Sequence, residues 1–295
     1  MGRCSTINRP EPNVAERELD MESDMGAASV GPTGSEKPLF PCIRVFGMPL
    51  HVVTEAQVVE AIGSAAAAGV GGWVITPNLD QLRQYHRMPE LREMYERASL
   101  VLADGMPLVW ASRLQKTPLP ERVPGSALIS TLSAGAAAKG LSVFFLGGNP
   151  GAADGAAREL AARYPGLKVA GTYCPPFGFE KDDAELGRIE QALANARPRI
   201  VFVGLGFPKQ ERLIDRVRHA APTAWFLGIG VSFSFVTGEV RRAPKLAQRM
   251  GLEWLHRMIQ EPGRLFKRYI IHDLPFAGRL FAHAMWARFR GRSGK

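Results

Sequence analysis

The 295-residue sequence lacks most of the features that identify disulfide scaffolds, metal sites and membrane spans. Its three cysteines, Cys4, Cys42 and Cys174, are far apart and show no metal-ligand spacing, which predicts a reducing compartment without disulfides. No stretch reaches the roughly 18 uninterrupted apolar residues of a membrane-spanning helix. Residues 1–37 are polar and contain no hydrophobic signal segment. We therefore expect a cytoplasmic protein.

Several catalytic signatures are missing as well. The sequence has no Asp-x-Asp pair, no H-E-x-x-H, no G-x-S-x-G and no Walker A loop. The histidines are scattered, and His256, His272 and His283 are expected on the surface rather than in a metal site. Metal-dependent hydrolysis and P-loop chemistry are therefore poor candidates, and we expect neither a metal ion nor a cofactor.

Positive charge is nearly balanced by negative charge over most of the chain and is in excess only at the C-terminus. Residues 241–295 contain 13 Lys and Arg against 3 Asp and Glu, whereas residues 1–240 contain 24 against 25. The net charge of +9 therefore comes from the last part of the chain. Such an asymmetry predicts a segment that meets an anionic partner.

Short apolar strands alternate with helical patterns through the middle of the chain. The expected strands are residues 73–76, 100–102, 141–148, 167–173, 199–206 and 224–230, with a strand or hairpin at 43–53. Because these strands are apolar without alternation, both faces of their sheet should be buried. We predict an α/β fold with a mostly parallel, Rossmann-like sheet and helices on both faces.

Three segments are expected along the chain. Residues 1–40 read as a flexible N-terminal extension. Residues 41–240 form the α/β core, and residues 241–295 form a basic amphipathic helical appendage.

One carboxylate, Asp104, stands where an apolar strand breaks into a turn. The dipeptide Asp104-Gly105 is typical of a turn. A helix is expected from Met106, because Pro107 is tolerated in the first turn of a helix. The carboxyl ends of parallel strands line the ligand crevice of an open α/β sheet. An acid at this place can bind a sugar or act as a general base.

Thr76-Pro-Asn78 ends another expected strand. The hydroxyl of Thr76 and the amide of Asn78 could hold a sugar or a phosphate. The alternative, which the sequence alone favours, is that this segment caps the helix expected from Leu79.

Two glycine-containing turns follow later strands. In Val203-Gly-Leu-Gly-Phe-Pro-Lys-Gln-Glu211, Gly204 and Gly206 allow close backbone approach to a ligand. Gln210 and Glu211 then open a helix. The Gln210 side chain can pair with a sugar hydroxyl or with the edge of a uracil base. The alternative interpretation of the whole motif is a turn with a helix cap and no ligand. Gly147-Gly148 could form an anion cradle or a tight strand-to-helix turn with about equal weight.

The C-terminal segment interleaves basic and apolar residues. Arg257, Arg264 and Arg268 are spaced by seven and four residues, which favours one helical face if Pro262-Gly263 does not break the helix. Guanidinium groups so placed could clamp a diphosphate. The alternative is a solvated basic face, but the density of apolar residues favours a membrane surface or a ligand.

Taken together, these motifs resemble the WecG/TagA/CpsF glycosyltransferase family from about residue 43 to residue 269. The residues that carry the resemblance are Thr76-Pro-Asn78, Ala103-Asp-Gly105, Gly204 to Glu211, Arg242-Ala-Pro244, Gly251-Leu-Glu-Trp-Leu255 and Glu261-Pro262. The resemblance implies an inverting, metal-independent transfer of a sugar from a UDP-sugar to a polyprenyl-diphosphate-linked saccharide, in the synthesis of a bacterial surface polysaccharide or cell-wall polymer. It implies a peripheral location on the inner face of the cell membrane.

The resemblance also implies roles for particular residues. Asp104 would be the base, Thr76 would lie near the acceptor, and Gln210 would bind substrate. Arg257 and Arg264 would complete the site at the membrane, with Arg268 or Lys267 aligned less closely. Similar sequences often carry an acid where this chain has Ser234, which leaves the identity of the donor sugar open.

Two other function classes stay open on the sequence alone. A dehydrogenase or methyltransferase would share the sheet and the Gly-x-Gly turn, although the third glycine of a dinucleotide fingerprint is missing. A nucleic-acid-binding protein could use the basic C-terminal segment. The expected partners are a UDP-sugar, a polyprenyl-diphosphate-linked acceptor and an anionic membrane surface, not a nucleic acid, and self-association is left open.

Overall fold

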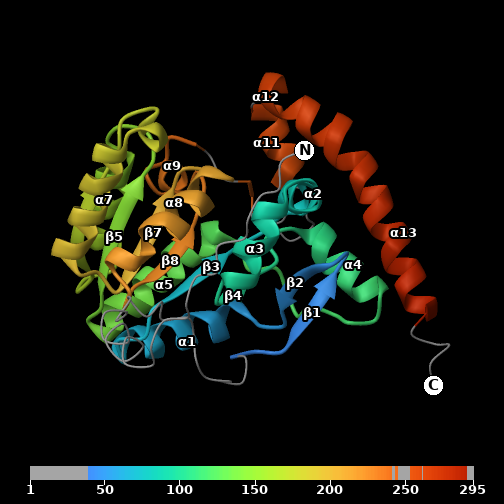
Figure 1. The fold of residues 1–295 in the computed structure, drawn as a ribbon, viewed down its shortest axis with the longest axis horizontal. Coiled ribbons are helices and arrows are strands. Elements are labelled where there is room, and N and C mark those ends of the chain that lie inside the picture. Colours follow the sequence, from blue (N-terminus) through green and yellow to red (C-terminus); the bar gives the residue numbers. More distant parts are fainter. Residues whose placement is uncertain (1–38, 241–242, 245–252, 261, 291–295) are drawn as a thin grey trace, which may run out of the picture. The chain divides into compact units, whose positions relative to one another are not determined.

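A six-stranded parallel sheet of order β4-β3-β8-β7-β5-β6 forms the centre of the fold (Figure 1). The computed structural model describes residues 39–240, 243–244, 253–260 and 262–290, and only the backbone of Arg257, Arg264 and Arg290. The strands are β3 (Gly72–Ile75), β4 (Leu100–Val101), β5 (Ser142–Gly147), β6 (Lys168–Tyr173), β7 (Ile200–Gly204) and β8 (Trp225–Gly228). The predicted α/β class is confirmed.

A separate antiparallel pair, β1 (Cys42–Val45) and β2 (Met48–His51), precedes the sheet. The turn between them is made by Phe46 and Gly47, both with positive φ. The hairpin alternative for the segment 43–53 is therefore correct.

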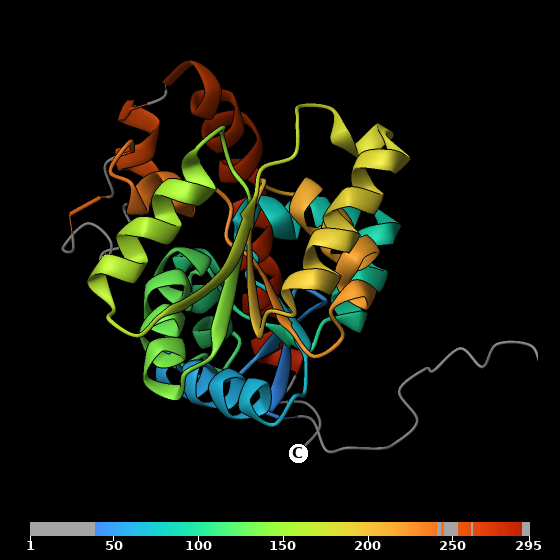
Figure 2. The same ribbon diagram turned by 90° about the vertical axis from the view of Figure 1, so that its left-hand side faces the viewer.

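Helices connect the strands and cover both faces of the sheet. They are α1 (Glu55–Ala67), α2 (Leu79–Arg87), α3 (Pro89–Arg97), α4 (Met106–Leu114), α5 (Gly125–Lys139), α6 (Ala152–Arg163), α7 (Asp183–Ala196), α8 (Lys209–Val217) and α9 (Ser232–Val236), with short 3₁₀ turns at Phe179–Lys181 and Arg218–Ala220. Figure 2 shows α5 and α6 on one side of the sheet and α7 and α8 on the other.

Two apolar cores lie on the two faces of the sheet. Successive strand residues point in opposite directions, so Trp73 and Ile75 pack into one core and Val74 packs into the other. All three side chains are buried. Burial on both faces explains why the strands read as continuous apolar runs in the sequence.

Local sequence signals set the helix boundaries. The Thr54 hydroxyl accepts a hydrogen bond from the Gln57 amide, in a capping box that opens α1. Pro89 separates α2 from α3. Asp182 caps α7 through the amides of Ala184 and Glu185.

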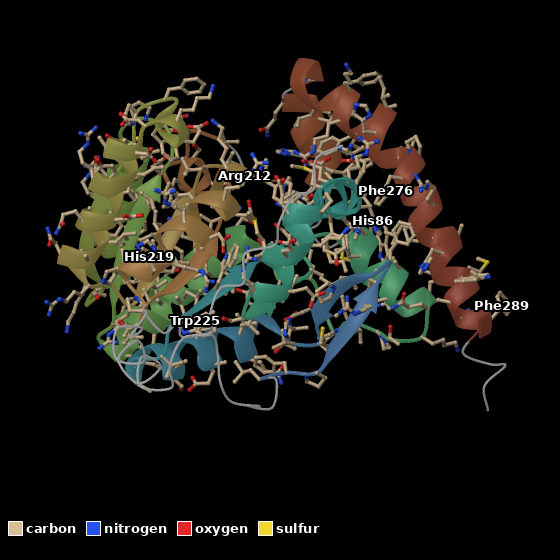
Figure 3. All side chains as sticks on the ribbon, viewed as in Figure 1. His86, Arg212, His219, Trp225, Phe276 and Phe289 are labelled. Carbon is tan, nitrogen blue, oxygen red and sulfur yellow. The ribbon has the colours of Figure 1, made fainter. Side chains whose placement is uncertain are left out.

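The C-terminal region is helical: α11 (Glu253–Gln260), α12 (Pro262–Phe266), a π-helical turn η4 (Lys267–Asp273) and α13 (Leu274–Arg290). Helix α13 packs along α4 (Figure 1). Phe276, Leu280 and Ala284 lie one turn apart and are buried in the same core as Trp73. The Phe276 ring lies beside His86, with centroids 6.2 Å apart, whereas Phe289 at the far end is exposed (Figure 3).

Among the described helices, none is both long and apolar enough to cross a membrane. The predicted N-terminal extension lies, up to residue 38, outside the described residues. The division at residue 240 into core and appendage stays a prediction.

Candidate active site

The carboxyl ends of the parallel strands bring most of the predicted site residues to one edge of the sheet. In the strand order, β3 neighbours β4 and β8, and β7 neighbours β8 and β5. The chain leaves β7 towards β8 but leaves β5 in the opposite direction, towards β6. Such a reversal opens a crevice at the carboxyl ends, where open α/β sheets bind ligands.

Asp104 and Thr76 follow neighbouring strands. The backbone amides of Leu102 and Asp104 donate to the carbonyls of Ile75 and Pro77, both at 2.9 Å, so the two strand extensions run side by side. Asp104 is half-buried and lies just before α4, which starts at Met106 as predicted. The structure therefore places the predicted base next to the Thr76 segment.

Asn78 serves as the N-cap of α2. Its Oδ1 accepts a hydrogen bond from the Gln81 amide at 3.1 Å, and its own amide donates to Gln81 Oε1 at 3.2 Å. The capping alternative is thus confirmed for Asn78, and its contact with substrate stays a prediction. Thr76 is buried, and its hydroxyl donates to the Gly228 carbonyl at 3.5 Å.

The sequence analysis missed the N-terminus of α5 as part of this edge. The 15-residue helix begins at Gly125, and no side chain caps it. A Cβ on Gly125 would lie 3.1 Å from both the Thr76 hydroxyl and the Gly228 carbonyl. The positive end of a helix dipole therefore abuts Thr76, and such ends favour anionic groups such as phosphates. The signal was the capless Pro124-Gly125 at the start of a helical pattern.

The Gly204 turn is tightly packed, and Gly206 is open. The Gly148 amide donates to the Gly204 carbonyl at 2.7 Å. A Cβ on Gly204 would lie 2.7 Å from the Phe233 ring, whereas one on Gly206 would meet nothing within 4 Å. Gly206 has φ +75°, a conformation that glycine adopts without strain. The half-buried Gly206 therefore has open space on its Cβ side, just before the cis Phe207–Pro208 bond and α8.

The Gly147-Gly148 segment is a tight turn from β5 towards α6. Both glycines have positive φ. A Cβ on Gly147 would lie 2.7 Å from Leu205, and one on Gly148 would lie 3.0 Å from the Phe233 ring. The tight-turn alternative accounts for both residues.

Gln210 and Glu211 are buried at the start of α8, with 4% and 1% of their surface exposed. Gln210 Nε2 donates to Glu211 Oε1, and Gln210 Oε1 accepts from the Gly230 amide, both at 2.9 Å. Burial raises the pKa of Glu211 to about 7. A side chain as buried as Glu211 offers almost no surface to a ligand, so its predicted contact with substrate has no support in this geometry.

Arg268 is half-buried at the rim of a cluster of charges between α2 and η4, whose other members are largely buried. Its Nη2 lies 3.2 Å from Asp80 Oδ2, and Arg83 Nε lies 3.3 Å from Asp273 Oδ1. Arg83 also contacts Asp80, which is buried. Burial, and then the charge of Asp80, raises the pKa of Asp273 to about 6. The cluster attaches the C-terminal helices to the helix that begins at Asn78.

The other two predicted arginines lie on α11 and α12. The side chains of Arg257 and Arg264 are outside the described part of the structure, so their predicted contact with a diphosphate stays a prediction. A contact that the sequence analysis missed joins the same region to the site edge: Arg122 Nη1 lies 2.9 Å from Glu253 Oε2. Arg122 lies just before α5, and Glu253 is the first residue of α11.

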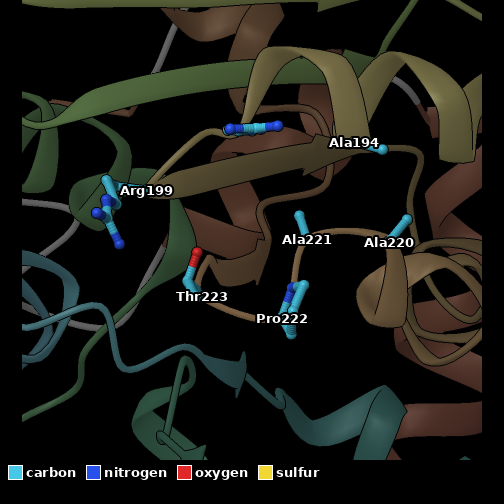
Figure 4. Close-up of a pocket in the computed structure, with 7 residues that line it drawn as sticks. Ala194, Arg199, Ala220, Ala221, Pro222 and Thr223 are labelled. Atoms are coloured by element: carbon cyan, nitrogen blue, oxygen red, sulfur yellow. The ribbon is translucent and has the colours of Figure 1, made fainter.

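Two pockets lie outside the Asp104–Thr76 edge. One, of about 330 Å³, is lined by Arg199, Pro222 and Thr223, which precede β7 and β8 and so lie at the amino ends of the strands (Figure 4). The other, of about 260 Å³, lies between α6 and α9 and includes Glu239. Ser234 Oγ donates to Glu239 Oε2 at 3.0 Å, so a carboxylate lies beside Ser234.

Comparisons with known proteins agree with this arrangement. A family model described as "Glycosyl transferase WecG/TagA/CpsF family" matches residues 43–290. A relative from Bacillus spizizenii, named N-acetylglucosaminyldiphosphoundecaprenol N-acetyl-beta-D-mannosaminyltransferase, is 32% identical over 194 residues, 66% of this chain and 73% of the relative. A Bacillus subtilis protein of the same name is 33% identical over 172 residues, 58% of this chain and 65% of that protein.

Proposed function

The chain belongs to the WecG/TagA/CpsF family of glycosyltransferases, and we propose that it transfers a sugar from a UDP-sugar to a polyprenyl-diphosphate-linked saccharide. Among the three function classes that the sequence left open, the family favours this one. The names of the two relatives make an N-acetylmannosaminyl donor and an N-acetylglucosaminyl-diphospho-undecaprenol acceptor the first pair to test. The observation that carries the proposal is the adjacency of Asp104 and Thr76 at the carboxyl edge of the sheet.

In the proposed reaction, Asp104 accepts the proton of the acceptor hydroxyl while the oxygen attacks the anomeric carbon of the donor. The bond from that carbon to the UDP oxygen breaks, and the configuration inverts. General-base assistance of this kind typically contributes about 10²- to 10⁴-fold. The hydroxyl of Thr76 lies next to the same segment; its proton is donated to the Gly228 carbonyl, so its oxygen is proposed to orient the acceptor as a hydrogen-bond acceptor.

The leaving UDP carries negative charge that the protein must stabilise. The N-terminus of α5 beside Thr76 and the backbone at Gly206 before α8, where the Cβ side is open, are the donors that we propose for this role. Arg257 and Arg264, from the C-terminal helices, are proposed to bind the diphosphate of the lipid-linked acceptor. The chemistry needs no metal ion in this scheme.

The experiment that tests the proposal is the Asp104→Asn variant in a transfer assay with UDP-sugars and a short polyprenyl-diphosphate-sugar acceptor. We expect turnover to fall by about 10²-fold or more, with UDP binding by calorimetry nearly unchanged. Asp183→Asn is the matched control, because Asp183 is exposed in the first turn of α7, away from Asp104. Wild-type turnover by Asp104→Asn would refute the assignment of the base.

We also propose that the C-terminal helices hold the enzyme peripherally at an anionic membrane surface. The large apolar side chains exposed there are Trp254, Ile259, Phe266, Ile271, Leu274, Met285, Trp286 and Phe289. They stand among basic residues, the combination that favours an anionic bilayer. The double variant Trp286→Ser/Phe289→Ser should sediment less with anionic vesicles. Phe177→Ser, which removes a fully exposed aromatic side chain from another loop, should leave vesicle binding unchanged.

A further inference from the structure

Glu211 is a buried acid for which the proposed reaction has no use. The side chain is 1% exposed, and its Oε2 has no hydrogen-bond partner among the described residues. Burying a carboxyl without full hydrogen bonding costs free energy, and the raised pKa of Glu211 reflects that cost. An apolar side chain of similar size would remove the cost, so the acid needs another explanation.

Glu211 is bonded to one atom of the Gln210 amide. Gln210 Nε2 donates to Glu211 Oε1, and Gln210 Oε1 accepts from the amide of Gly230, both at 2.9 Å. Gly230 follows β8 at the carboxyl edge, where its φ of +57° turns the chain towards α9. The Gln210 amide is therefore a bridge between Glu211 and the β8–α9 turn.

The bridge also depends on space beside β8. A Cβ on Gly228 would lie 2.4 Å from Gln210 Nε2 and 2.8 Å from Gln210 Cδ. The amide therefore packs directly against the backbone of Gly228. The carbonyl of the same glycine accepts the hydroxyl of Thr76. The position of the Gln210 amide thus sets the backbone to which Thr76 is bonded.

We propose that Glu211 is a positioning residue that fixes the orientation of the Gln210 amide and, through it, the backbone from Gly228 to Gly230 beside Thr76. The inference rests on the proposed function for its kinetic consequences only. An amide can present either its oxygen or its nitrogen to a neighbour, but Glu211 Oε1 accepts a hydrogen bond both in the carboxylate and in the acid that carries its proton on the unpartnered Oε2. Glu211 therefore directs Nε2 towards itself and leaves Oε1 for the Gly230 amide.

The proposal predicts that replacing Glu211 by an apolar residue keeps or raises the stability of the fold but lowers the activity of the site. In Glu211→Met the acceptor is lost, but an apolar side chain of similar length fills the space. We expect the melting temperature to stay the same or to rise. The Gly230 amide should exchange its hydrogen faster by roughly fivefold or more, as expected when one hydrogen bond is weakened. Transfer should slow by roughly 10-fold or more because a nearby site residue is misplaced.

Two further variants isolate the hydrogen bond. Gln210→Met removes the bridge itself and should reproduce the faster exchange of the Gly230 amide. Glu211→Gln keeps an acceptor oxygen and should bring exchange and kcat back to within a few-fold of wild type. Exchange is measured by mass spectrometry on peptides covering residues 224–236, and kcat and KM for the donor are measured separately.

The outcomes separate the two proposals. If the wild type transfers no sugar, the proposed function fails, while the exchange data still test the bridge. If Glu211→Met and Gln210→Met leave exchange at Gly230 unchanged, the positioning role is overturned. It is also overturned if Glu211→Gln is as slow as Glu211→Met with normal exchange, because the charge of Glu211 would then act directly.

Discussion

The sheet and the C-terminal helices are held in two different ways. The strands are buried on both faces by apolar side chains such as Phe202 and Leu227, which are completely buried. Helix α13 contributes a narrow apolar stripe, to which the C-terminal helices add a cluster of charges on α2 and η4 and the Arg122–Glu253 ion pair. Apolar burial is non-directional and tolerates changes in salt and pH, whereas ion pairs do not.

This difference indicates that the two regions can respond separately. The site edge lies on the rigid sheet, while the arginines proposed for the acceptor lie on helices attached by charges. A lipid-linked acceptor must reach both regions. An attachment that relies partly on ion pairs, beside the apolar stripe of α13, is expected to let the helices adjust to the acceptor or the membrane without loss of the sheet.

The largest expected effect is in the sheet itself. Phe202→Ala removes a fully buried ring that packs 5.7 Å from the ring of Phe145. We expect the free energy of unfolding to fall by about 3–5 kcal/mol. Urea denaturation measures the loss, and Val169→Ala on the exposed edge strand is the control, with an expected loss below about 1 kcal/mol. Similar losses in the two variants would contradict the description of the core.

Glu211 is the exception that makes one part of this core sensitive to pH. Its folded pKa of about 7 lies above the ordinary value of 4.5. The folded state therefore binds the proton more tightly than the unfolded state. Its contribution to stability is fully present below pH 4.5 and is lost as the pH rises through 7. The loss amounts to about 3 kcal/mol, from 1.36 kcal/mol per pH unit.

The measurement is the free energy of unfolding of wild type and Glu211→Gln at several pH values from 4.5 to 8. The difference, wild type minus variant, should become less favourable by about 3 kcal/mol over this range. The subtraction cancels the titration of all other groups. A flat difference would show that Glu211 is ionised normally and that its burial is less complete than described.

The sequence predicted the sheet because its signals are local. Continuous apolar runs mark strands buried on both faces, and Asp104 and Thr76 fall where those runs end. Asp80 and Asp273, in contrast, stand 193 positions apart in the sequence and meet only after folding. No spacing rule reveals such a pair, so the sequence indicated a diphosphate clamp or a solvated basic face for Arg268 and not its contact with Asp80.

The Gln210-Glu211 pair shows a second limit of prediction from the sequence alone. Both residues are polar and follow a glycine turn, which indicates ligand contact. The structure buries both side chains, because α8 lies against the sheet and its first turn meets Gly228 and Gly230; the contact of Gln210 with substrate stays a prediction. Which face of a first helical turn is buried depends on packing against a distant strand. The hydrophobic periodicity of the nine-residue helix α8 does not determine which face of its first turn is buried.

Removing a charge from the cluster should loosen the C-terminal helices alone. Arg83→Met leaves Asp80 and Asp273 with Arg268 as the remaining cation. We expect the attachment to weaken by about 2 kcal/mol, less than for fully buried pairs because Arg268 still compensates. Hydrogen exchange in residues 262–290 should become about 30-fold faster, with the sheet unaffected. Arg97→Met, whose Asp215 partner is on the surface of α8, is the control.

The smallest expected effect lies where the two regions meet at the site edge. Arg122 and Glu253 form a 2.9 Å ion pair with side chains 18% and 17% exposed. A double-mutant cycle with Arg122→Gln and Glu253→Gln should give a coupling energy of about 1 kcal/mol. Raising the salt concentration to 1 M should reduce it. The cycle is read from urea unfolding or from exchange in α11.

This small coupling energy is the sharpest test of whether the sheet and the C-terminal helices respond separately. Arg122 lies directly before the α5 N-terminus beside Thr76, so any strong contact here would fix the C-terminal helices to the site. A coupling above about 3 kcal/mol would be typical of a core contact, and the two regions would then move as one body. A coupling near 1 kcal/mol, about fivefold in an equilibrium constant, would mean that this ion pair can break within thermal reach and does not fix α11 to the segment before α5.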